Sequence, residues 1–145
     1  MRPSLGKYLS GATGTLGREI APHLDTAYAR AQIGAIGMVL GFVAREADRA
    51  AETLVNEQDA LRALFASAAG APLPDDLRTR LAAAESAARA SLRISDLERE
   101  NAALKALLIE LHEAVEQSEA CAGLEAQIWN ILKDGAKARV ISLGR

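Results

Sequence analysis

The sequence predicts an all-α protein, a helical bundle of four or five helices, from three observations. Half of its 145 residues are apolar, and Ala and Leu dominate this class. Only five residues are aromatic: one Trp, two Tyr and two Phe. Ala and Leu are among the best helix formers, whereas strands favour β-branched and aromatic residues. Apolar residues also recur at steps of three and four along most of the chain, which is the period of one helix face.

Charge and cysteine content restrict the expected partners and location. The 17 basic and 19 acidic residues nearly cancel, so no strong field attracts nucleic acid or an anionic membrane. The single cysteine, Cys121, cannot form an internal disulfide, which favours a reducing compartment. The longest apolar run, Ile33 to Ala44, has 12 residues, whereas a membrane span needs about 20. We therefore expect a cytoplasmic protein that binds neither nucleic acid nor a membrane.

The first half of the chain divides into an irregular segment, 1–14, and a helical hairpin region, 15–68. Gly, Ser, Thr and Pro are frequent in the first segment and are typical of loops. In the hairpin region, Pro22 fits the first turn of a helix. Residues at helical spacing then mark one face, and the helix is apolar most of the way round, which indicates a central or interface position. That face comprises Leu24, Tyr28, Ala31, Ala35, Met38 and Phe42.

Three glycines, Gly34, Gly37 and Gly41, interrupt this apolar helix. Each costs a helix about 1 kcal/mol relative to Ala. We expect close packing against a neighbouring helix backbone to compensate. An irregular break between two shorter helices is the alternative.

The second half begins after a linker at 69–74, which contains two prolines and a glycine. Acidic residues then favour a helix start at Asp75. No Gly or Pro interrupts 75–118, which predicts one long helix of about 65 Å at 1.5 Å per residue.

A final helix over about 120–134 should end at Gly135, so that 75–135 comprises the long helix and a C-terminal helix. A basic tail, 136–145, completes the chain.

Within the long helix, residues 94–115 follow the heptad pattern of a coiled coil and resemble a leucine zipper over about three heptads. An Asn at an a position favours two parallel strands in register. We expect this stripe to carry self-association as a homodimer. Packing within one chain is an alternative, because Leu107 widens the stripe, and association with a different chain is another. The a positions are Ile94, Asn101, Leu108 and Val115, and the d positions are Leu97, Leu104 and Leu111.

The charges beside the stripe fit a parallel dimer, in which Glu100 of one chain would meet Lys105 of the other. DNA-binding zippers carry a dense basic helix before the heptads. Residues 80–93 hold only three arginines among alanines, so DNA binding is not implied.

Gly11, Gly14 and Gly17 have the GxxGxxG spacing and resemble the nucleotide-binding turn of short-chain dehydrogenases. In those enzymes the glycines let the backbone approach a pyrophosphate at a helix N-terminus. The motif needs an apolar strand before it, and Leu5 to Ser10 does not have that character. A nucleotide-binding protein that uses this turn is therefore an alternative function.

A small-molecule-binding helical bundle is a further alternative, with a pocket lined by Met38, Phe42, Phe65 and Trp129. We expect no cofactor and no catalytic residues. We also expect no metal site, because neither histidine lies in the Glu-x-x-His pattern of di-iron bundles.

A set of positions within 16–65 carries a family resemblance: Leu16, Glu19, Pro22, His23, Leu24, Arg30, Ile33, Val39, Leu40, Val43, Ala44, Arg45, Glu46, Glu57, Leu61 and Leu64. This pattern is similar to an uncharacterised bacterial helical domain found beside or fused to aminoglycoside-phosphotransferase-like kinases and acyl-CoA dehydrogenases. The resemblance implies a small bacterial accessory protein with one of those enzymes as its partner. Our leading interpretation is a non-catalytic helical interaction or accessory module that self-associates through the zipper-like stripe.

Overall fold

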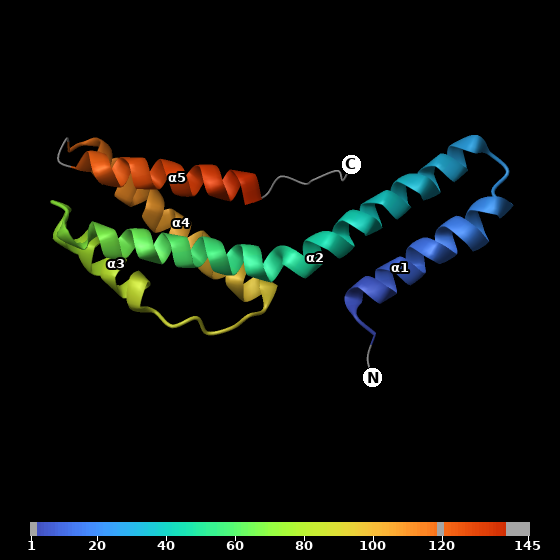
Figure 1. The fold of residues 1–145 in the computed structure, drawn as a ribbon, viewed down its shortest axis with the longest axis horizontal. Helices are drawn as coiled ribbons and strands as arrows, with labels where there is room; N and C mark the ends of the chain where they lie inside the picture. Colours follow the sequence, from blue (N-terminus) through green and yellow to red (C-terminus); the bar gives the residue numbers. More distant parts are fainter. Residues whose placement is uncertain (1–2, 119–120, 139–145) are drawn as a thin grey trace. The chain divides into compact units, whose positions relative to one another are not determined.

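The computed structural model describes residues 3–118 and 121–138, the side chain of Asp48 excepted, and these residues form helices and no strands (Figure 1). The all-α prediction is confirmed. A π-helical segment, Leu16–Ile20, and two 3-10 segments, Ala21–His23 and Ala68–Gly70, join the main elements. The α-helices are α1 (Leu5–Thr15), α2 (Ala27–Ser67), α3 (Asp75–Ser86), α4 (Ile94–Glu116) and α5 (Ala122–Ala138).

The chain forms two compact units, which we call unit 1 (1–50) and unit 2 (51–145). Unit 1 contains α1 and the first half of α2. Unit 2 contains the second half of α2 together with α3, α4 and α5.

In unit 1, the segment 1–14 is not irregular, because α1 begins at Leu5. Ser4 caps this helix, and its Oγ accepts a hydrogen bond from the backbone N–H of Lys7 at 3.4 Å. Such a cap satisfies a backbone donor that the helix itself leaves unpaired. The prediction of an irregular segment was wrong because it used only the loop-forming composition. The intrinsic helix propensity of single residues is a weak guide, since the structural context often overrides it.

Helix α2 is continuous across its three glycines, so the alternative of a break there is wrong. Thr26 Oγ1 accepts from the N–H of Ala29 at 3.1 Å and caps the start of this helix. None of the three glycines meets a neighbouring helix backbone as expected, and only Gly37 has a near neighbour, a side-chain methyl: an added Cβ would lie 3.4 Å from Thr13 Cγ2 of α1. Gly34 and Gly41 have open space around them.

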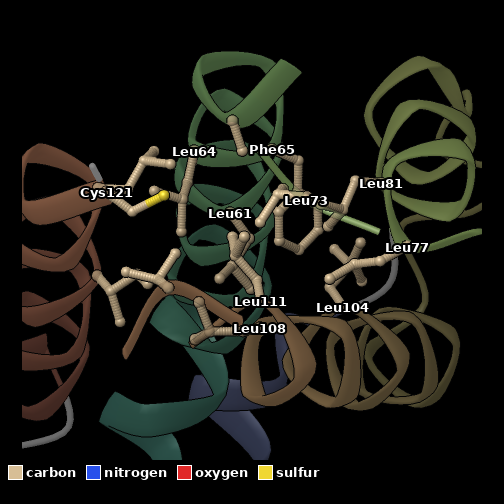
Figure 2. Packing of buried hydrophobic residues seen from close by; sticks show 14 residues of the cluster. Leu61, Leu64, Phe65, Leu73, Leu77, Leu81, Leu104, Leu108, Leu111 and Cys121 are labelled. Atoms are coloured by element: carbon tan, nitrogen blue, oxygen red, sulfur yellow. The ribbon is translucent and has the colours of Figure 1, made fainter. Parts of the chain in front are cut away.

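The core of unit 2 lies where α3, α4 and α5 meet the second half of α2 (Figure 2). Each helix contributes apolar residues at steps of three and four, the spacing that places them on one face. The core consists of Leu61, Leu64, Phe65, Ala68, Leu73, Leu77, Leu81, Leu104, Leu108, Leu111, Val115, Cys121, Leu124 and Ile128.

The single helix predicted over 75–118 is instead two helices, because α3 ends at Ser86 and α4 begins at Ile94. Both helices direct leucines into the same core, which a straight 65 Å helix could not do. Arg62 of α2 donates from Nε to the carbonyl oxygen of Ala84 at 3.2 Å. The last four carbonyls of a helix lack partners within it, so this contact stabilises the end of α3.

A proline substitution tests this break. Ala88 is exposed and follows Ala87, whose extended backbone (ψ 124°) suits a residue before proline. We expect Ala88→Pro to change the free energy of unfolding by less than about 1 kcal/mol, whereas Ala102→Pro within α4 should cost about 3 kcal/mol or more. Urea unfolding of both variants measures the difference. A similar large cost for both would indicate a continuous helix.

Gly135 does not end the last helix, because α5 continues to Ala138. A Cβ on Gly135 would lie 3.2 Å from Glu57 Oε1 of α2. The glycine therefore allows α5 to pass close to this carboxylate instead of acting as a C-terminal stop. Of the predicted basic tail, residues 139–145 lie outside the described residues.

Candidate interaction surface

The zipper-like stripe lies inside unit 2 and packs within one chain. Six of its seven residues are buried, from Leu97 to Val115, and only Ile94 is partly exposed. Leu61 and Leu111 lie together at the centre of the core, with Leu108 beside them (Figure 2). Helices of the same chain cover the stripe, as the alternative of packing within one chain predicts, and self-association through it stays a prediction.

Asn101 makes its hydrogen bond to a residue of its own chain. Its Nδ2 donates to Glu57 Oε2 of α2 at 2.7 Å, and Lys105 Nζ lies 2.8 Å from Glu57 Oε1. Asn101 Oδ1 is buried and has no hydrogen-bond partner. Glu100, the other charge assigned to a dimer, forms an ion pair with Arg62 of α2. The polar residues that suggested a parallel dimer thus join α4 to α2.

A second set of polar contacts, which we call the Gln58 network, anchors the connection between α3 and α4. Gln58 is fully buried, and its Nε2 donates to the carbonyl oxygen of Leu97 at 2.8 Å. Arg89, in the connection, donates from Nε to Gln58 Oε1 at 3.1 Å and pairs with Asp59. Because each of these groups has a partner, the network has the character of a structural support. No local sequence pattern pointed to it.

The predicted aromatic pocket is not assembled in either unit. Phe65 is enclosed by leucines in the core of unit 2 (Figure 2). Trp129 is 47% exposed and makes an edge-to-face contact with His112, with the ring centroids 5.7 Å apart. Met38 and Phe42 belong to unit 1.

The glycines of the nucleotide-binding motif lie in helices. Gly11 and Gly14 are in α1, and Gly17 is in the π-helical segment that follows it. A pyrophosphate-binding turn needs a loop between a strand and a helix N-terminus. That turn is absent from residues 5–20, so these glycines cannot present their backbone as the motif requires.

No metal site is found among the described residues, since they contain no suitable group of three His, Cys, Asp or Glu side chains. His112 Nε2 lies 3.5 Å from Glu116 Oε1. This separation permits attraction if the imidazole is protonated, but the pair lacks hydrogen-bond geometry.

A groove of about 230 Å³ lies between α3 and α4, and Asp76, Arg80, Glu110 and Glu113 contribute to its lining. Arg80 donates to both carboxylate oxygens of Glu110, at 2.9 and 2.5 Å. These hydrogen bonds lower the pKa of Glu110 and raise that of Arg80 from their usual values. The groove is polar, and its cation is already paired.

Unit 1 differs from unit 2 because its described residues form no buried core. Among its described residues, none is buried. Eight of the thirteen exposed large hydrophobic residues described in the chain lie there: Leu5, Tyr8, Ile20, Tyr28, Ile36, Met38, Val39 and Val43. Exposed apolar surface, where it is contiguous, marks sites of protein or membrane interaction.

Two of these eight residues, Tyr28 and Val39, lie on one face of α2 that we call the α2 stripe: Tyr28, Gln32, Ala35, Val39, Phe42 and Glu46. Steps of four and three residues place these positions on one side of a helix. Tyr28 is 74% exposed and Val39 56%. Gln32 Nε2 donates to Tyr28 Oη at 2.6 Å. The predicted apolar face already included Tyr28, Ala35 and Phe42, but the period alone does not say what covers it.

The segment Ala27–Ala47 of α2 has the length and composition of a membrane span, with a mean hydropathy of 1.4 in its most apolar window and no buried residue in that window. The expectation of no membrane contact counted only the uninterrupted apolar run. The mean hydropathy of this segment is high although it includes arginines near its two ends, so a search for an uninterrupted apolar run does not find it.

Comparison with protein-family models, curated proteins and solved structures finds no match for this chain. A functional proposal therefore depends on the geometry of the chain itself.

Proposed function

We propose that the protein is a non-catalytic helical interaction module, in which unit 1 presents the α2 stripe to another protein chain. Unit 2 supports this proposal as the folded body, because its core is buried and the Gln58 network is paired. The observation that carries the proposal is the absence of any buried residue among the described residues of unit 1. An apolar helix surface without a core gains free energy when a partner covers it.

A protein chain fits this surface better than a bilayer does. Between Arg30 and Arg45, α2 has 14 uncharged residues, which cover about 21 Å at 1.5 Å per residue. Between Lys7 and Arg18, the first helical segment has 10, which cover about 15 Å. The hydrocarbon core of a bilayer is about 30 Å thick. A spanning hairpin would therefore place charges in hydrocarbon, at about 2.5–3.5 kcal/mol or more for each Arg or Lys.

Replacement of the exposed apolar residues tests the proposal. Val39 of the α2 stripe can be changed to Gln together with three exposed residues beside the stripe, Ile36, Met38 and Val43, and Gln keeps a good helix propensity. We expect the wild-type chain at low concentration to bind the dye ANS through this surface, and the variant to bind much less. The free energy of unfolding of unit 2, measured by the fluorescence of Trp129, should change by less than about 1 kcal/mol, because exposed side chains contribute little to stability.

Two results would contradict this function. A loss of several kcal/mol in unit 2 would mean that these residues pack against the body of their own chain. Flotation of the wild-type chain with phosphatidylcholine vesicles, abolished in the variant, would make a bilayer the partner.

A further inference from the structure

We propose that the chain that covers the α2 stripe is a second copy of this protein, with its α2 antiparallel to the first. This inference rests on the proposed function, since it names the partner. The first support is the spacing. The six positions of the α2 stripe are separated by four, three, four, three and four residues, which is the seam pattern of a coiled coil.

The second support is the match between the two copies. In an antiparallel pair related by a two-fold axis at the level of Gly37, every contact occurs twice. Val39 of one copy then faces Ala35 of the other, so a larger side chain meets a small one. Phe42 faces Gln32 across the same seam.

Glu46 and Tyr28 close the ends of this arrangement. Glu46 is exposed, and it would face Tyr28 of the second copy. Gln32 already donates to Tyr28 Oη, so the phenolic hydrogen is available for a carboxylate. In the dimer, the carboxylate of Glu46 at the end of the stripe would therefore accept a hydrogen bond from Tyr28 of the second copy.

The third support is the penalty on the alternative orientation. In a parallel pair, Glu46 would face Glu46 at the seam, and this like-charge contact is unfavourable. The antiparallel pair has no such contact. On the two sides of the seam it brings Ile36 to Ile36 and Met38 to Met38, which extends the apolar contact. Both residues are exposed in the single chain, at 45% and 62%.

The absolute mass of the full chain, measured by light scattering after size-exclusion chromatography over a dilution series, tests the partner. We expect a mass of twice 15.3 kDa at high concentration. Val39→Glu should raise the dissociation constant of the dimer by ~100-fold or more, because each dimer would bury two carboxylates. Ile109→Glu is the matched control, since Ile109 is 69% exposed in unit 2, and it should leave the constant unchanged. Circular dichroism checks that both variants keep their helical content.

Disulfide trapping tests the orientation. A mixture of Ala35→Cys and Val39→Cys chains should form a disulfide between the two variants much faster than either variant forms one with itself. Cys121 is buried and does not compete. Fast trapping of Ala35→Cys with itself would indicate a parallel pair and overturn the proposal.

The failures of the two proposals are distinguishable. A chain that stays at 15.3 kDa at every concentration, yet loses ANS binding in the Gln variant, overturns the second copy and leaves another protein as the partner. A dimer that Val39→Glu does not weaken places self-association on a different surface. Equal ANS binding by the wild-type chain and the Gln variant removes the proposed function as well.

Discussion

Leu111→Ala is expected to lower the free energy of unfolding of unit 2 by about 2–5 kcal/mol. Leu111 is fully buried against Leu61 and its neighbours in the core (Figure 2). Truncation to Ala removes apolar contacts and leaves a cavity that the surrounding helices fill only in part. Urea unfolding monitored by Trp129 fluorescence measures the change, because Trp129 is the only tryptophan and lies in unit 2.

Ile109→Ala is the control for this change. It lies on the same helix but is 69% exposed, so its effect should stay within about 0.5 kcal/mol. The loss in Leu111→Ala should also be independent of protein concentration, since the leucine packs inside one chain. A loss that grows on dilution would instead place the stripe between chains.

Gln58→Ala is expected to cost about 2–4 kcal/mol, although the substitution removes no charge. The side chain is fully buried, donates to the carbonyl oxygen of Leu97 and accepts from Arg89. Its loss opens a cavity and leaves Arg89 Nε without this acceptor. The exposed Gln127 provides the matched control, because its side chain makes a hydrogen bond at the surface, accepted from Ser67 Oγ at 3.0 Å, and Gln127→Ala should change stability by no more than about 0.5 kcal/mol.

A double-mutant cycle with Arg89→Ala isolates the contact itself. We expect a coupling energy of about 1 kcal/mol or more, because the two residues share one hydrogen bond and Arg89 lies in the connection between α3 and α4. Additive effects would show that Arg89 positions the connection through Asp59 alone.

These results would define unit 2 as a body that is complete within one chain. The surface proposed for binding, the α2 stripe, lies in unit 1 and shares no residue with that core. The two properties together are those of a module that folds on one part and binds with another.

The helical class could be read from local pattern, and so could the start of α3. Ala and Leu content and the steps of three and four are properties of neighbouring residues, and they hold whatever the helices pack against. Asp75 likewise begins a helix for a local reason, since acidic residues favour its first turn. The heptad positions of α4 were also correctly grouped on one face, since six of them are buried together.

Tertiary contacts decided the rest. A heptad spacing shows which residues share a face, but it does not distinguish a helix of the same chain from a helix of another. For α4, Glu57 and Leu61 of α2 provide the partners within the same chain, because they lie about 40 residues away in sequence and meet Asn101 and the core. Near the break after Ser86, Arg62 and Arg89 make contacts of the same long-range kind. Such contacts join residues that are distant along the chain, and no local pattern encodes them.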